Sequence, residues 1–481
     1  MELVKEIKDY KLILGLIVLQ LLVTVPFIDS APICNDEPFS IFYAQQKISE
    51  FIPFLNTGNN PPLHFILLHY IIEIFGSTAS SVRSLSLLFN ILTIPVLYNF
   101  GKQFLNKKET ILLIGFFIFS TFNHYHAIEA RVYSLMVLLT VLIFYEIYKL
   151  IFLQNFNFIM LAIWNVLLMY SHYLGGIVIL LEIILLVVFY FKMNKQKIIY
   201  FILSGIISLI LFLPMILLLF ERIGDFSTNG TWVSKPHLSE LYGNIVRFLN
   251  AKYSVLMIGG VVLIIIIKNY KLIVNDKLKG VFSHKNIFIF LIFGLSYFGI
   301  FIFSILKQPI FIDRYLLFIT PFLFLSLIII IKYLLFGKKN NLVLISLIIP
   351  MIIFCEYLPD TNRNPNEMTK FVLNNQTDNS KILISPPFYE LTFLYHFNNE
   401  IFKDYKNLEK SKKTNGIHSI YSFNNLTKIK FGESFFFIDA KSELMLPNNE
   451  ILNNLQEEYL LKEVRVFDGR YRIYYFLNKR K

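Results

Sequence analysis

Two adjacent carboxylates, Asp36 and Glu37, stand in the stretch "SAPICNDEPFSIFYAQ" at residues 30–45. They follow an apolar run of about twenty residues, which is the length that crosses a membrane. Carboxylates at a membrane edge are costly unless they are solvated or paired, and they often mark a functional site. The alternative is that both residues stabilise the N-terminus of a short helix through its dipole. The residues alone leave both interpretations open.

Other groups suited to acid–base or anion chemistry flank later apolar segments. The segment "EARVY" holds Glu129, Arg131 and Tyr133, "SHY" holds His172 and Tyr173, and "DRYLLF" holds Arg314 and Tyr315. An arginine can bind phosphate through two parallel hydrogen bonds, so Arg83, Arg131, Lys307 and Arg314 are candidates for an anionic headgroup. The alternatives are ion pairs at helix starts and snorkelling side chains.

His124 and His126 precede the "EARVY" segment at a spacing that could suit a metal ion. No third ligand lies nearby in the sequence, so we expect both histidines to be packed rather than metal-bound. Glu37 or Glu129 would be the candidate ligand if a divalent cation binds, although the sequence requires no cofactor.

Composition indicates a polytopic α-helical membrane protein. The chain has 481 residues, 55% of them hydrophobic, with a mean hydropathy of +0.58. A soluble domain cannot bury so much apolar surface. The net charge of +12 is expected in cytoplasmic loops. No nucleic-acid-binding pattern is present.

About eleven apolar segments are long enough to predict transmembrane helices. They lie near 11–28, 83–104, 110–123, 132–152, 157–171, 174–191, 198–220, 253–267, 287–306, 315–335 and 341–358.

The short segment 61–75, "PPLHFILLHYIIEIF", carries His64, His69 and Glu73 and is ambiguous. If it lies flat on the outer surface, every strongly basic short loop falls on the cytoplasmic side, as the positive-inside rule requires. If it crosses the membrane, the later loops are inverted. We therefore predict an interfacial helix over 61–75 within a first outer loop at 29–82.

The layout predicts two domains, a transmembrane domain at 1–358 and a small extracytoplasmic α/β domain at 359–481. The tail has helix-like stretches ("NEMTKFVLNN", "FYELTFLYHF", "EILNNLQEEY") and strand-like ones ("KILIS", "ESFFFIDA", "KEVRVF", "RYRIYYFL"). The N-terminus is predicted to be cytoplasmic.

On this layout, acids, histidines, arginines and tyrosines gather on the outer face. That arrangement suits a site where a lipid-borne phosphate meets a polar acceptor. A transporter would place polar groups at the bilayer midplane, whereas these spans are mostly Ile, Leu and Phe, with Glu182 and Asn165 among the exceptions.

The order of motifs resembles the GT-C glycosyltransferases. "DEPFSIFYA", "NNPPLHFILLHYIIEIFGSTASSVRSLS", "EARVYSLMVLL", "SHY" and "DRYLLFITP" follow one another as in the protein O-mannosyltransferase superfamily and its bacterial relatives, which include the lipid A aminoarabinose transferases. The resemblance covers about residues 10–360 and implies a GT-C fold.

The resemblance also implies roles for individual residues. Asp36 would be the catalytic carboxylate, supported by Glu37. The Pro-Pro-Leu element at 61–63 opens a juxtamembrane helix in that family. The family often has a histidine or a Glu-Lys pair just before these prolines, where this chain has Asn59 and Asn60, which puts a metal or phosphate role of that position in doubt. Glu129, Arg131 and Tyr133 match the second outer motif, and Arg314 and Tyr315 match a late motif near the lipid phosphate.

The function expected is transfer of a sugar from a polyprenyl-phosphate donor to an acceptor hydroxyl at the outer face of a bacterial inner membrane. The acceptor would be a glycan, a lipid or a protein, and Asn60, His64, Arg83, His172 and Tyr173 are further candidates for substrate binding. A lipid-carrier ligase or polymerase of another group, or a transporter without chemistry, remain the alternatives.

Overall fold

A computed structural model describes two compact units. The described residues are 2–50, 60–229, 233–274, 280–335, 341–358, 364–377, 380–420, 426, 429, 431–444, 449–467 and 471–479. The first unit comprises Met1–Phe27, Ile52–Leu67 and Arg83–Tyr357, and the second comprises Ile28–Phe51, Leu68–Val82 and Leu358–Lys481. Two of the basic loops that are predicted to be cytoplasmic lie partly outside the described residues, at 275–279 and 336–340.

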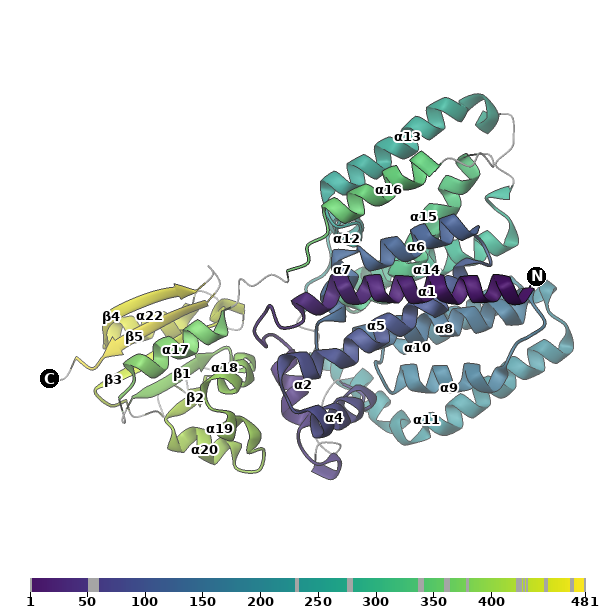
Figure 1. The fold of residues 1–481 in the computed structure, drawn as a ribbon. Coiled ribbons are helices and arrows are strands. Elements are labelled where there is room, and N and C mark those ends of the chain that lie inside the picture. Colours follow the sequence, from purple (N-terminus) through teal and green to yellow (C-terminus); the bar gives the residue numbers. More distant parts are fainter. Residues whose placement is uncertain are drawn as a thin grey trace. The chain divides into compact units, whose positions relative to one another are not determined.

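The first unit is helical (Figure 1). Its elements are α1 (Glu2–Thr24), η1 (Val25–Phe27), α5 (Ala79–Gly101), α6 (Lys107–Ile118), α7 (Thr121–Ala127), α8 (Tyr133–Phe152), α9 (Phe158–Met169), α10 (Gly175–Val188), η2 (Tyr190–Lys192), α11 (Lys195–Asn229), α12 (Ser239–Phe248), α13 (Lys252–Val274), α14 (His284–Leu306), η4 (Asp313–Ile319), α15 (Thr320–Leu334) and α16 (Asn341–Ile353). The start of α4 (Leu63–Phe75) also belongs to this unit, whereas the first residues of α5, up to Val82, belong to the second.

Within the described residues, seven helical segments are long and apolar enough to cross a membrane, and all seven lie where spans were predicted. The other four predicted spans are shorter helices. Of these, α9, α10 and α16 have 12, 14 and 13 residues. The predicted span 110–123 is divided between α6 and α7, because the chain leaves the helix after Ile118 and Ser120 caps the next helix by accepting from the Asn123 amide.

Helix α8 lies in the core of the first unit. It is buried along most of its length and packs against α9, α10 and η4. Aromatic rings pack beside the half of α8 that is predicted to face the cytoplasm. Phe144 and Phe100 both contact Phe322. Phe100 also contacts Tyr148 at a ring separation of 5.9 Å. Such edge-on ring pairs stabilise a core beyond their buried area.

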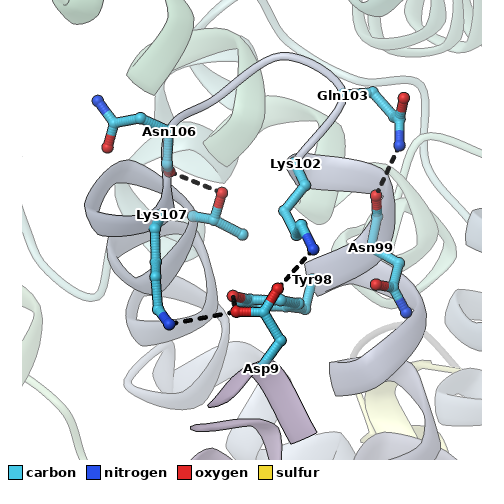
Figure 2. A network of polar contacts seen from close by, with 8 residues as sticks. Asp9, Tyr98, Asn99, Lys102, Gln103, Asn106 and Lys107 are labelled. Carbon is cyan, nitrogen blue, oxygen red and sulfur yellow. Dashed lines mark hydrogen bonds and ion pairs between the residues drawn. The ribbon is translucent and has the colours of Figure 1, made fainter. Parts of the chain in front are cut away.

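A polar network joins the beginning of α1 to the end of α5 (Figure 2). The Asp9 carboxylate lies 2.6 Å from Lys102 Nζ and 3.2 Å from Lys107 Nζ, and it accepts from the Tyr98 hydroxyl at 3.2 Å. Nearby, Lys108 Nζ donates to Asn341 Oδ1 at the start of α16. These contacts bring together the start of α1, the end of α5 and the starts of α6 and α16.

The second unit contains a five-stranded sheet, with helices on its faces (Figure 1). Its helices are α2 (Glu37–Ala44), the later part of α4, α17 (Pro365–Asn375), η5 (Pro387–Tyr389), α18 (Glu390–Phe397), α19 (Asn399–Lys403), α20 (Leu408–Thr414), η6 (Ser442–Leu444) and α22 (Glu450–Glu458), and its strands are β1 (Lys381–Ser385), β2 (Ile417–Ser419), β3 (Ser434–Asp439), β4 (Leu460–Phe467) and β5 (Tyr471–Leu477). The strand order is β2-β1-β3-β5-β4. Strand β1 pairs in parallel with β2 and β3, whereas β5 pairs antiparallel with β3 and β4.

Strand β3 is buried on both faces, which explains its continuous apolar run. Phe435 and Phe437 join the core under α22, whereas the ring of Phe436 meets Phe371 of α17. The three helices and four strands that the tail patterns predict are all present. The short β2 was not predicted, since three residues carry too little pattern.

Candidate active site

The turn between α7 and α8 carries the "EARVY" residues of the first unit. Its backbone is fixed by three hydrogen bonds: the Arg131 amide donates to the Glu129 carbonyl at 2.7 Å, the Ser86 hydroxyl donates to the Arg131 carbonyl at 3.0 Å, and the Ser134 hydroxyl donates to the His126 carbonyl at 2.8 Å. The turn is therefore attached both to α5 and to the first turn of α8.

Glu129 is paired with His126, a histidine that sequence reasoning set aside. His126 Nδ1 lies 2.7 Å from Glu129 Oε2, and both side chains are buried. In the neutral form of the ring with Nδ1–H donating to the carboxylate, the other ring nitrogen is an acceptor. This Nε2 is buried and has no hydrogen-bond partner among the described residues. The spacing of three residues between His126 and Glu129 could have suggested the pair, but whether the two side chains meet depends on how the chain leaves α7.

A row of rings links this pair to two other predicted site segments. The ring of His126 lies 5.0 Å from Tyr133, Tyr133 lies 6.4 Å from His172, and His172 lies 5.3 Å from Tyr315. The row thus crosses from α7 to α8, then to the loop before α10, and then to η4. Residues more than 180 positions apart in the sequence are brought together, as the predicted convergence requires.

Two arginines give this end of the first unit a positive potential. Arg131 and Arg314 both act on His172, and burial together with their charges lowers the pKa of that histidine to about 3. Burial and Arg131 likewise lower the pKa of His64, in the first turn of α4, to about 3. Both histidines are therefore neutral at physiological pH, and the positive charge comes from the arginines.

The tautomer of His172 follows from a backbone contact. The Leu174 amide donates to His172 Nδ1 at 3.1 Å, so the proton of the neutral ring is on Nε2. His172 is thus a hydrogen-bond donor rather than a general base in this form.

The start of α4 is tied to the same end, since the Leu63 amide donates to the Tyr170 carbonyl at 2.9 Å. Just before it, Asn60 is half-buried in a bend, and Asn59 lies outside the described residues. Arg83 is buried in α5, and Tyr173 is half-buried in the loop beside His172.

Asp313 has a partner that the sequence did not suggest. It forms an ion pair with Arg247 of α12, and its Oδ1 accepts from the Arg314 amide at 2.7 Å. The pair anchors the start of η4, the segment that presents Arg314 and Tyr315. Only the fold reveals it, because 66 residues separate the two side chains.

Asp36 and Glu37 belong to the second unit, at the start of α2. Asp36 occupies the N-cap position, yet its side chain makes no capping hydrogen bond. The buried Glu37 lies in the first turn, where its Oε2 accepts from the Cys34 amide at 3.4 Å. Glu37 therefore supports the local turn, whereas Asp36 fills the cap position without performing the capping contact of the alternative interpretation.

His124 serves the packing of the first unit. Its Nε2 lies 2.9 Å from the Tyr357 carbonyl, and its ring packs edge-on against Phe27. Among the described residues, no group of three or more His, Cys, Asp or Glu side chains is placed to hold a metal ion.

Comparisons with known proteins place this architecture. The sequence model of the dolichyl-phosphate-mannose-protein mannosyltransferase family matches residues 59–218. ArnT from Cupriavidus metallidurans in the apo state superposes with a TM-score of 0.59, covering 97% of this chain and 98% of that chain at 10% identity. The chain therefore has the GT-C fold of this ArnT. The same ArnT bound to undecaprenyl phosphate gives a TM-score of 0.56 at 10% identity and the same coverage. Comparison with curated proteins gave no match.

The GT-C assignment confirms the predicted fold class, a polytopic helical protein with a small C-terminal sheet domain. The family match spans α4, α5, α8 and the loop with His172, and so covers most of the described cluster in the first unit.

Proposed function

We propose that this GT-C protein transfers a sugar from a polyprenyl-phosphate donor to an acceptor hydroxyl, with inversion at the anomeric carbon. The observation that carries the proposal is the concentration of positive charge around neutral histidines at one end of the first unit. Arg131 and Arg314 act on a common neighbour, His172, whose ring is itself a donor. Such a set of donors suits a phosphate.

The donor phosphate would bind to the two arginines. Charge-assisted hydrogen bonds from guanidinium groups would hold the lipid phosphate in the ground state and stabilise it as the leaving group. His64, Arg83 and Tyr315 would complete the surroundings of the donor, and Tyr133 offers an aromatic face to the sugar. Support comes from ArnT, which shares the fold and has been crystallised with undecaprenyl phosphate.

Asp36 would act as the base. Its carboxylate takes the proton of the acceptor hydroxyl while the hydroxyl oxygen bonds to the anomeric carbon. The bond between that carbon and the phosphate oxygen breaks, and polyprenyl phosphate leaves with the electron pair. Glu37 holds the turn that carries Asp36, and Glu129 with His126 positions the sugar. Glu37 or Glu129 could also hold a divalent cation, which this scheme does not require.

The reaction would occur at the outer face of a bacterial inner membrane, with the N-terminus cytoplasmic, the second unit extracytoplasmic and α4 lying in the interface. The acceptor would be a glycan, a lipid or a protein, and Asn60 and Tyr173 would contact the substrates. A reporter fused after Gly76 tests the sidedness, because an interfacial α4 leaves that position outside.

The decisive experiment compares the wild type with Asp36→Asn in detergent, supplied with synthetic polyprenyl-phosphate hexoses and pentoses and an envelope-lipid extract as acceptor. Release of polyprenyl phosphate reports turnover for any sugar. Loss of a general base is expected to lower the rate by about 10²–10⁴-fold. Near-normal turnover by well-folded Asp36→Asn contradicts the assignment.

Detergent also separates an enzyme from a transporter, because transport across a membrane needs a sealed compartment whereas bond cleavage does not. Release of polyprenyl phosphate in detergent therefore favours the transferase, and an intact donor with every sugar and acceptor tested favours the transporter.

A further inference from the structure

The second unit combines the C-terminal domain with the loop that carries Asp36. Residues Ile28–Phe51 and Leu68–Val82 form one compact body with Leu358–Lys481, although more than 270 residues of chain separate them from that tail. The sheet domain is thus the packing partner of the loop to which the proposed function gives the base.

One contact reaches the turn just before the carboxylates. His396 of α18 lies with its Nε2 2.6 Å from the carbonyl oxygen of Ile33. A carbonyl can only accept, so Nε2–H donates, and burial lowers the pKa of His396, which favours the neutral ring. Ile33 itself is buried. This hydrogen bond is short, and its acceptor lies three residues before Asp36.

The backbone after Ile33 needs such support. Asn35 has φ +57°, a left-handed conformation that costs a non-glycine residue energy unless its surroundings hold it. The turn is closed by the Glu37 amide, which donates to the Cys34 carbonyl at 3.2 Å. A hydrogen bond to Ile33 therefore fixes the entry of a strained turn whose exit carries Asp36.

The far end of α2 is held by the same domain. Gln45 Nε2 donates to the Phe402 carbonyl at 3.3 Å, and Gln46 Nε2 donates to the Lys403 carbonyl at 3.2 Å. Between the two ends, the ring of Phe42 packs 5.5 Å from Phe402. Helix α2 is thus attached at its start, its middle and its end to α18 and α19.

We propose that His396 is a positioning residue for Asp36, and that the C-terminal domain acts as a brace that fixes the base of the reaction. This inference rests on the proposed function. The domain then contributes to the rate of transfer without touching the substrate, by restricting where the Asp36 carboxylate can lie.

The test measures kcat and the donor KM of full-length His396→Leu and His396→Gln in detergent. Leucine removes the donor, and a misplacement near 1 Å can cost roughly a hundredfold, so kcat is expected to fall by about ten- to a hundredfold with the donor KM little changed. Glutamine can donate through its amide and is expected to recover most of the rate. His396→Asn, whose amide is shorter, should resemble the leucine variant and replaces it if that variant does not fold.

A matched control removes a buried hydrogen bond elsewhere in the same domain. The Ser442 hydroxyl donates to Asp439 Oδ1 at 2.8 Å, at the end of β3. Ser442→Ala should lower the thermal stability of the domain and leave kcat unchanged. An equal fall in kcat for Ser442→Ala and His396→Leu would reduce His396 to a structural residue and overturn the proposal.

A double variant separates the two proposals. If His396 acts only through Asp36, adding His396→Leu to Asp36→Asn leaves the residual rate unchanged. A further multiplicative loss contradicts positioning. If Asp36→Asn alone retains turnover, the proposed base is wrong. If Asp36→Asn is inactive while His396→Leu and His396→Asn are both normal, only the brace is wrong.

Discussion

The two units hold their positive charges in different surroundings. In the second unit, the buried Lys412 ammonium lies 2.8 Å from Glu390 and 2.5 Å from Glu409, so acids surround the base. In the first unit, the half-buried Arg131 and Arg314 lie near His172, and their charges add to the effect of burial in lowering the pKa of that histidine. A buried charge is costly unless it is paired. The Lys412 group is therefore a feature of stability, whereas two arginines beside a donor ring suit the phosphate of the proposed donor.

The same contrast distinguishes which substitutions should alter the rate and which should alter unfolding. Changes among the arginines are expected to act on the donor, and changes at Lys412 on the stability of the fold. The comparison fails if the arginine substitutions change only stability and the Lys412 substitution changes only the rate.

Among the donor-binding residues, the largest effect on the rate is expected for Arg314→Gln. Hydrogen bonds to charged groups contribute about 1.5–3 kcal/mol, so kcat/KM for the polyprenyl-phosphate donor should fall roughly ten- to a hundredfold. Arg314→Lys keeps the charge but not the paired donors, so its kcat/KM should lie between those of the wild type and Arg314→Gln. The matched control is Arg465→Gln, which removes an exposed arginine of β4 that pairs with Glu463. Equal losses for both variants would show that the charge of Arg314 has no special place.

A clear effect on stability, and not on the rate, is expected at the paired charges. Lys412→Met leaves the Glu390 carboxylate buried without its ammonium and should destabilise the second unit by about 3–5 kcal/mol. The double variant Glu390→Leu with Lys412→Met removes both charges and should recover much of the loss. Thermal unfolding in detergent measures both. A double variant as unstable as the single one would show that the pair does more than compensate its own burial.

The smallest effect is expected in the pH dependence. The pKa of His172 is about 3 in the folded protein, against about 6.5 for an exposed histidine. Below pH 6.5 the unfolded chain binds a proton that the folded chain does not, so stability falls as pH drops from about 6.5 towards 3. His172→Gln, which retains a donor, should show a flatter decline of Tm between pH 7 and 4. Identical slopes for wild type and variant would contradict the depressed pKa.

Periodicity and length were sufficient for most of the fold. Apolar runs located the long helices, and alternation located strands such as "KILIS" and "RYRIYYFL". The interruption at Ser120 was missed, because an apolar run continues past a capping serine whose partner amide is known only from the backbone. Strand β2 was missed because three residues at a sheet edge carry no period.

The site was predicted less completely, for reasons of geometry. Ordered motifs indicated Arg131, Tyr133, His172 and Tyr315, and the structure brings them together. The pairs His126–Glu129 and Arg247–Asp313 depend on where a turn points and on which helices meet, and neither is encoded in a local pattern. The role of His396 could not be predicted for the same reason, since its acceptor is a backbone carbonyl in a loop distant in the sequence.

The shortness of α9 and α10 has a consequence for the lipid around them. With 12 and 14 residues, these helices extend roughly 18–21 Å at 1.5 Å per residue, whereas the hydrocarbon core of a bilayer is about 30 Å thick. A membrane adapts to short helices by thinning locally. The loop between them carries His172, so we expect the leaflet to dip beside that histidine. A carrier lipid diffusing into such a dip would bring its headgroup down to the level of the loop before it meets any side chain.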